Sequence, residues 1–343
     1  MSFEFVPILL ILSAITFVTQ FVDSGLGLGF GMTTTPILLI LGYQPSEIVP
    51  GLLLTNLGAG IVVTIFHKIL KNLELGIQNQ EEKGEGEKEI VKEEGEREEF
   101  TKRKNKKEKT FTMEESANNG KWWELVANWI GNLTDDSKVI IVLSSFAVIG
   151  TITSGVLSVV FEYSDAFTFG VEIYIGVMLF VIGIVLLVLR KKRLKPTWPK
   201  IVSLGVVAGF NKGISGGGYG PLTVSGQILS GRNEKHAIAS TLFSETIAAF
   251  IGVITYILTH VFVSLGQNNP ISWEYLYLAP YLLIGAVLAA PIAAFTTNKL
   301  KSKWLEIAVG GMTIFLGLLT LVRITLLHFG VWKAIPRFVE MFS

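Results

Sequence analysis

Gly27-Leu28-Gly29-Phe30-Gly31 and Gly216-Gly217-Gly218-Tyr219-Gly220 are two glycine-rich stretches that interrupt apolar segments of this chain. They match each other at an offset of 189 residues, which also places Gly42 on Gly231. Glycine is unfavourable inside a helix, so each stretch predicts a helix break. Broken backbone at membrane depth is tolerated only where it is buried in protein or lines a cavity. Paired breaks at corresponding places in two halves therefore indicate a binding site of the kind found in membrane transporters.

The composition is that of a polytopic membrane protein. Of the 343 residues, 50% are hydrophobic, and the mean hydropathy is +0.53. Several apolar runs reach the ~20 residues that span a bilayer; the runs cover 3–22, 46–70, 138–160, 171–190, 234–263, 273–297 and 304–327. Cysteine is absent, which excludes disulfides and thiol chemistry. We expect a multi-pass protein of the cell membrane, embedded in the lipid bilayer, with no catalytic residue, metal, cofactor or nucleic-acid partner.

Residues 71–137 differ from the rest of the chain. They hold 17 of the 28 acidic and 12 of the 29 basic side chains, so this segment cannot bury a core and is predicted to be a solvated loop. Trp122, Trp123 and Trp129 predict a short amphipathic helix on the membrane surface near its end. The loop is either a regulatory element or an insertion that the fold tolerates, since long surface loops cost little stability.

The repeat continues beyond the glycine stretches, because Ile173–Met178 aligns with Ile307–Met312. We predict an all-α fold of two inverted repeats, each a glycine-broken, re-entrant segment followed by three transmembrane helices. Residues 1–70 and 138–195 form the first repeat, 71–137 a charged cytoplasmic loop, 196–329 the second repeat and 330–343 a C-terminal tail.

Lysine and arginine in short loops set the predicted orientation. They place 190–195 and 298–303 in the cytoplasm, whereas the uncharged link 264–272 is placed outside. Segment 199–231 then enters and leaves on one face, as a hairpin does. The alternative topology has eight transmembrane helices that each cross the membrane once and no hairpin. The first apolar run, 3–22, is long enough to cross the membrane alone.

The start of a helix inside the membrane exposes backbone N–H groups and a partial positive charge of about half a unit. Glycine lets an anion approach this backbone, and hydroxyl groups add donors. The candidate substrate-binding residues lie in or beside the two stretches and are Gly27, Gly29, Gly31, Thr33, Thr34, Asn211, Lys212, Ser215, Gly216, Gly217, Gly218 and Tyr219. The alternative is that the glycines only permit close helix packing, which we expect of Gly176, Gly183, Gly310 and Gly317.

Ionisable residues within apolar runs are functional candidates because they are costly in lipid. Asp23 and Lys212 occupy equivalent positions, four residues before each glycine stretch, so they could pair, or Lys212 could contact the anion. Glu245, early in a long apolar run, is either a proton acceptor or a hydrogen-bond partner of the hairpin, and with Asp23 it is a candidate for coupling. His67 and Lys68, near the end of an apolar run, are expected to reach for the membrane interface.

The two stretches, followed by Pro36 in the first half and Pro221 in the second, resemble the sulfite exporter TauE/SafE family. Gly-Gly-Gly-Tyr-Gly-Pro is the more specific motif, and the first stretch departs from the commoner Gly-Gly-Gly form. The resemblance implies transport of a small sulfur-containing anion such as sulfite, thiosulfate or an organosulfonate. The leading interpretation is a secondary transporter working as an exporter, with proton or sodium coupling and a homodimer left open. The alternatives are an anion channel and an intramembrane enzyme.

Overall fold

The computed structural model describes residues 5–27, 29–77, 129–161, 164–189, 198–229, 232–297 and 302–331. Two compact units are present, the first made of Met1–Leu73 with Val139–Ser343 and the second of Glu74–Lys138. Within the described ranges the regular structure is helical apart from one isolated bridge, which confirms the predicted all-α class.

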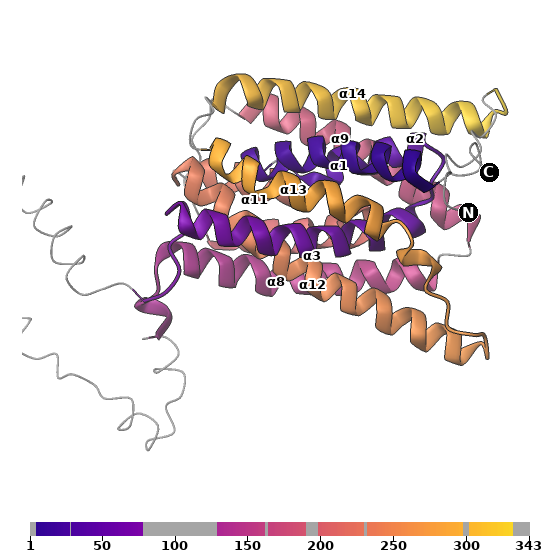
Figure 1. Cartoon of the computed structure of the whole chain (residues 1–343), viewed down its shortest axis with the longest axis horizontal. Coiled ribbons are helices and arrows are strands. Elements are labelled where there is room, and N and C mark those ends of the chain that lie inside the picture. The colour runs from indigo at the N-terminus through magenta and orange to yellow at the C-terminus, as the bar shows by residue number, and fades with distance from the viewer. Residues whose placement is uncertain are drawn as a thin grey trace, which may run out of the picture. The chain divides into compact units, whose positions relative to one another are not determined.

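Six helices in the described part of the chain are long and apolar enough to cross a membrane, which confirms a polytopic membrane protein. They belong to α3, α8, α9, α12, α13 and α14, whereas α2 and α11 are too short to cross. The bounds are α1 (Phe5–Leu26), α2 (Phe30–Ile40), α3 (Pro45–Ile69), α8 (Asp135–Val160), α9 (Asp165–Leu189), α10 (Trp198–Ser215), α11 (Tyr219–Leu229), α12 (Glu234–Gly266), the 3-10 turn η1 (Glu274–Leu276), α13 (Ala279–Thr297) and α14 (Ser302–His328) (Figure 1).

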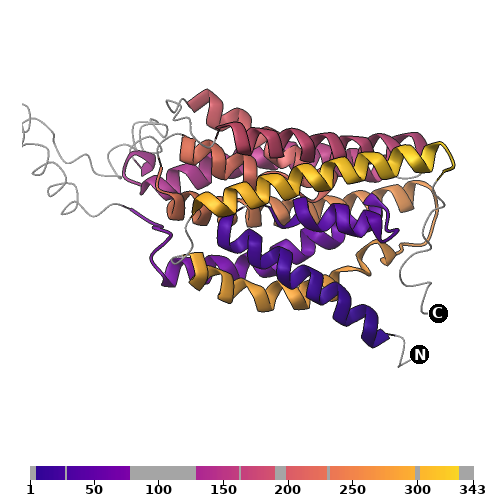
Figure 2. The same ribbon diagram turned by 90° about the horizontal axis from the view of Figure 1, so that it is seen from above.

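The helices α1 and α2 form a hairpin. Ser13 Oγ, in the first half of α1, donates a hydrogen bond of 2.9 Å to the carbonyl oxygen of Tyr281 near the start of α13. The ring of Tyr43, just after α2, lies 6.4 Å from the ring of Tyr277, also near the start of α13. The first half of α1 and the end of α2 therefore lie at the same end of the bundle, and Figure 2 shows α1 beside α13.

The helices α10 and α11 form a second hairpin. A Cβ atom on Gly226, near the end of α11, would lie 2.4 Å from Cδ1 of Leu204, near the start of α10. Their turn contains the second glycine stretch. Along α10, Gly205 packs against Leu143 of α8 and Gly209 against Ala147, so α8 and α10 run in the same direction.

The two hairpins open toward opposite ends of the bundle. The first leads directly into α3 and the second into α12, and these two helices are antiparallel, because Gly60 packs against Thr246 and Leu53 against Gly252. In an inverted repeat the two hairpins must enter the bundle from opposite ends, and this arrangement meets that requirement. The two-fold relation between the halves itself stays a prediction.

Glycines on α9 and α14 allow these two helices to pack closely. A Cβ atom on Gly183 would lie 2.9 Å from the carbonyl oxygen of Gly310, and one on Gly317 would lie 2.9 Å from that of Gly176. Figure 1 shows the two helices side by side. The packing role expected of these four glycines is confirmed.

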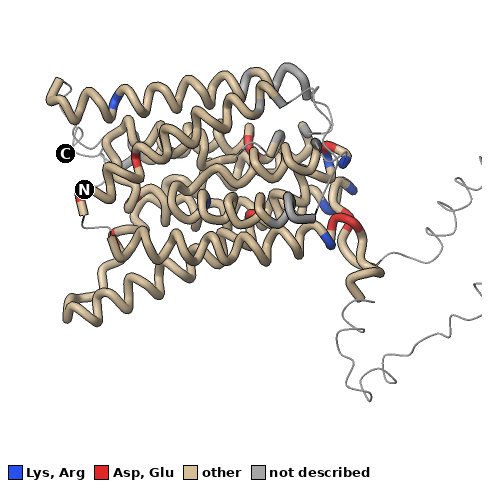
Figure 3. The backbone as a smooth tube through the Cα atoms, turned by 180° about the vertical axis from the view of Figure 1, so that it is seen from behind, with Lys and Arg blue, Asp and Glu red and all other residues tan. Residues whose placement is uncertain are grey.

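Apart from the buried Lys212 and Arg323 of α14, the described Lys and Arg residues of the first unit gather at one end of the bundle, which we call the basic end (Figure 3). Lys68 lies there in the last turn of α3, and Lys71 follows the helix; Arg232 precedes α12, and Lys235 lies in its first turn. Away from that end, Arg323 of α14 lies 3.8 Å from Glu172 of α9, so its charge is compensated within the bundle. A cytoplasmic location of the basic end stays a prediction from the positive-inside rule.

The second unit holds the two ends of the charged segment together. The backbone N–H of Glu74 donates to Asp136 Oδ2 over 2.8 Å, and Thr134 Oγ1 donates to the carbonyl oxygen of Glu74 over 2.6 Å. The predicted surface helix at Trp122 and Trp123 lies outside the described residues, as does most of the predicted C-terminal tail.

Candidate functional site

The two glycine stretches touch each other, backbone to backbone. A Cβ atom on Gly31 would lie 1.9 Å from the carbonyl oxygen of Gly216, and one on Gly217 would lie 2.6 Å from the carbonyl carbon of Gly31. A Cβ atom on Gly220 would lie 2.5 Å from the carbonyl oxygen of Gly27. Because no side chain fits at this contact, packing alone is a sufficient reason for glycine at Gly31, Gly217 and Gly220.

Equivalent glycines in the two stretches share an unusual backbone conformation. The φ angles are +64° at Gly27 and +72° at its counterpart Gly216, and +90° at Gly29 and +79° at Gly218. Side chains other than glycine rarely adopt these angles. The two breaks are thus built in the same way, which supports the repeat alignment.

The second helix of each hairpin begins at the glycine stretch. The helix α2 starts at Phe30 and α11 at Tyr219, so both helices begin within the glycine stretches, as the helix breaks predicted. Pro221 lies in the first turn of α11, where the missing N–H costs least.

A carboxylate already occupies the start of α2. Asp23 Oδ1 accepts a hydrogen bond of 2.7 Å from the backbone N–H of Gly29, and Asp23 is 2% exposed. Gln20 Nε2 holds the neighbouring Ser24 hydroxyl at 2.8 Å and lies 3.5 Å from Asp23 Oδ2. Asp23 therefore acts as an internal anion for the first glycine stretch.

Lys212 pairs with Glu245, not with Asp23. Its Nζ atom lies 2.6 Å from Glu245 Oε1, and the two residues are 0% and 3% exposed. Asp23 is bound to its own loop but interacts electrostatically with both charges. If all three groups are ionised, the interior carries one uncompensated negative charge. Glu245 Oε2 has no hydrogen-bond partner among the described residues.

Asn211 and Ser215 support the second glycine stretch. Ser215 Oγ donates to the Asn211 carbonyl oxygen over 2.7 Å and accepts the Gly217 N–H over 3.2 Å. Thr35 Oγ1 from the first hairpin donates to the Ser215 carbonyl oxygen over 2.7 Å, which joins the two halves. The Asn211 side chain accepts a hydrogen bond from the hydroxyl of Tyr174 on α9. Sequence reasoning missed Tyr174, because no repeat or motif connects it to the glycine stretches.

Three hydroxyls among the predicted site residues already donate hydrogen bonds. Thr33 Oγ1 lies 3.2 Å from the Phe30 carbonyl oxygen, and Thr34 Oγ1 lies 2.9 Å from Thr19 Oγ1. The hydroxyl of Tyr219 donates to Ser244 Oγ on α12 over 3.0 Å, and Tyr219 is fully buried. Tyr219 thus faces α12, and all three remain predicted, not demonstrated, substrate contacts.

The prediction that His67 reaches the membrane interface is wrong. His67 is fully buried, its Nε2 lies 3.4 Å from the carbonyl oxygen of Ser24, and its Nδ1 lies 3.3 Å from Asn72 Nδ2. The reason is tertiary, since the His67 side chain meets the backbone of Ser24 near the end of α1. Lys68, the next residue, is exposed.

A membrane-embedded helix bundle with charged and polar groups gathered around two helix breaks defines a class of polytopic transport proteins. The family model for sulfite exporter TauE/SafE matches residues 121–320, so this chain belongs to the sulfite exporter TauE/SafE family of membrane transporters. It is 30% identical over 139 residues to the probable membrane transporter protein YtnM of Bacillus subtilis (strain 168). That match covers 39% of this chain and 42% of the relative, less than half of its length. No solved structure matches the chain.

Proposed function

We propose that this protein is a secondary transporter that exports a small sulfur-containing anion, such as sulfite, thiosulfate or an organosulfonate, bound between the two hairpins. The observation that carries the proposal is the contact of the two glycine stretches beside a buried lysine. Paired helix breaks beside buried charges are how many transporters build a midplane site. The sulfur chemistry rests on the family, because helix ends and hydroxyls attract small oxyanions in general.

The second glycine stretch is the better place for the anion. At the first, the carboxylate of Asp23 takes the N–H of Gly29, and its charge repels a second anion. At the second, protonation of Glu245 would free the positive charge of Lys212 for the anion. Asn211 lies beside Gly218, where a Cβ atom would be 3.1 Å from the Asn211 amide nitrogen. The start of α11 adds the favourable end of a helix dipole.

Asp23, Lys212 and Glu245 are proposed to couple the anion to a proton. Two carboxylates around one ammonium leave an excess negative charge in a region where uncompensated charge is costly. An incoming anion makes this excess larger, so it binds best when one carboxylate is protonated. Protonation of Asp23 would also weaken its hold on Gly29 and expose that N–H to the anion. Sodium at the free oxygen of Glu245 is the alternative coupling ion.

The test is ligand binding by the purified protein. Thermal shifts are measured with sulfite, thiosulfate, sulfate, taurine and sulfoacetate. We expect one sulfur anion to stabilise the wild type, and Gly218→Ala to lose that shift because of strain at φ +79°. Gly311→Ala is the control, since a Cβ atom there has no neighbour within 4 Å. Equal ligand shifts in both variants would mean that the glycine stretch only packs.

An anion channel is the remaining alternative within this class of fold. A channel conducts without coupling, so neutralising Glu245 should leave its flux unchanged. A coupled transporter with Glu245→Gln should lose the dependence of its flux on the pH gradient. Proteoliposome flux measured with and without a pH gradient separates the two functions.

A further inference from the structure

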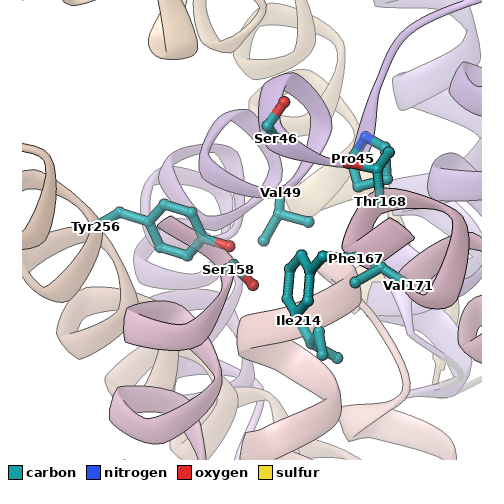
Figure 4. A pocket seen from close by; sticks show the side chains of 9 residues that line it. All are labelled: Pro45, Ser46, Val49, Ser158, Phe167, Thr168, Val171, Ile214 and Tyr256. Carbon is teal, nitrogen blue, oxygen red and sulfur yellow. The ribbon is translucent and has the colours of Figure 1, made fainter. Parts of the chain in front are cut away.

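A small pocket lies at the end of the bundle opposite the basic end. It has a volume of about 20 Å³ and is lined by Pro45, Ser46, Val49, Ser158, Phe167, Thr168, Val171, Ile214 and Tyr256 (Figure 4). A cavity holds a water when its volume exceeds roughly 10–15 Å³. The space therefore admits about one water and is too small for a sulfur atom with three oxygens.

The pocket leads from that end toward the second glycine stretch. Pro45 and Ser46 start α3, and Phe167 and Thr168 lie in the first turn of α9. On the inner side, Ile214 directly precedes Ser215 and the glycine stretch itself. The pocket therefore lies between one face of the bundle and the proposed anion site.

Tyr256 lines the inner part of the pocket. Its hydroxyl, on α12, donates a hydrogen bond of 2.9 Å to the carbonyl oxygen of Gly213, the residue before Ile214. Its ring packs against Gly155 of α8, where a Cβ atom would lie 3.4 Å from the ring. In Figure 4 the hydroxyls of Tyr256 and Ser158 point toward the ring of Phe167. Displacing the Tyr256 side chain would widen the space next to Ile214.

The lining suits an anion in passage and not one that is held. Four of the lining residues carry hydroxyl groups, and none is charged. Ser158 Oγ is buried without a hydrogen-bond partner among the described residues, so its donor is unused. Hydroxyls can replace part of an oxyanion's hydration, whereas a fixed cation would trap it.

We propose that this pocket is the outer vestibule of the anion path, closed in this conformation, and that Tyr256 is its gate. The inference rests on the proposed function, since it supplies the route between the anion site and the outside. Tyr256 is a gating residue in this proposal and makes no contact with the bound anion.

The absence of cysteine from the sequence allows a direct test by cysteine labelling. Single cysteines replace Ser46 at the mouth, Ile214 at the inner end and Leu288, which is 59% exposed on the outer surface of α13. A membrane-impermeant, negatively charged methanethiosulfonate is added outside intact cells, without substrate. We expect fast labelling at position 46, slow labelling at 214 and none at 288.

A substitution that loosens Tyr256 should change the labelling rate only at position 214, the inner end of the pocket. Tyr256→Phe removes one hydrogen bond, so labelling at 214 should accelerate by up to about tenfold, whereas Tyr281→Phe, the same change away from the pocket, should leave it unaltered. No external labelling at 46, or the same rate at 214 with and without Tyr256→Phe, overturns the proposal. If 214 labels as expected but no sulfur anion slows the reaction, the vestibule stands and the proposed substrate fails.

Discussion

Removing the ammonium group of Lys212 should destabilise the protein more than any other change to its buried charges. Lys212→Met leaves the carboxylates of Asp23 and Glu245 in the interior without a counter-charge, where they are 2% and 3% exposed. Breaking a buried ion pair from one side costs about 3–5 kcal/mol. Glu245→Gln should cost less, because Asp23 remains to balance Lys212.

Asp23→Asn should change stability least, since the amide oxygen of asparagine can still accept the N–H of Gly29 and the Lys212–Glu245 pair stays intact. The expected order of destabilisation is Lys212→Met, then Glu245→Gln, then Asp23→Asn. Free energies of unfolding are measured in mixed detergent micelles by titration with dodecyl sulfate. Each variant is compared with the wild type at a single pH and salt concentration.

Two double variants separate the ion pair from the net charge. Both Lys212→Met with Glu245→Gln and Lys212→Met with Asp23→Asn leave the interior with one negative charge. Only Lys212→Met with Glu245→Gln removes both partners of the 2.6 Å contact, so this double variant should regain most of the stability that Lys212→Met loses. The interaction energy from the double-mutant cycle should be at least ~1 kcal/mol. Two outcomes would refute the assignment of Glu245 as the partner of Lys212. One is an equal recovery of unfolding free energy in the two double variants. The other is that the effects of Lys212→Met and Glu245→Gln simply add.

Three further predictions concern orientation and packing. A cysteine at Gln44 should label from outside the cell and one at Ser302 only from inside; external labelling at Ser302 would contradict the predicted orientation. Gly217→Ala should cost about 1–3 kcal/mol in unfolding free energy, because its Cβ atom would lie 2.6 Å from the Gly31 backbone. In the control, Gly311→Ala, the Cβ atom has no neighbour within 4 Å, so the change should be neutral or stabilising. Glu172→Gln should cost no more than about 1 kcal/mol, since its 3.8 Å contact with Arg323 is loose and part-exposed; a loss as large as that of Lys212→Met would contradict this ranking.

The helix breaks were predictable from sequence because they depend on local chemistry. Clustered glycines cannot continue a helix, and their spacing in the two halves marked both hairpins. Apolar length likewise predicted the six crossing helices, since the bilayer fixes how many residues a helix needs. The glycines of α9 and α14 were correctly assigned to packing for the same local reason, that small residues let helices approach.

The side-chain partners could not be predicted in this way. A repeat alignment relates equivalent positions, so it suggested Asp23 for Lys212, but contacts form between positions that are not equivalent. The direction of Lys212 toward α12, the burial of His67 beside α1 and the bond from Tyr174 to Asn211 each depend on which helix lies next to which.

The sequence by itself determined the membrane class, the positions of the two helix breaks and the family, because hydropathy, glycine and short motifs act within one segment. Only the tertiary structure decided that the breaks touch backbone to backbone, that Glu245 neutralises Lys212 and that Asp23 binds the first glycine stretch. These features join segments up to about 190 residues apart, and their geometry follows from helix packing, which no local pattern encodes.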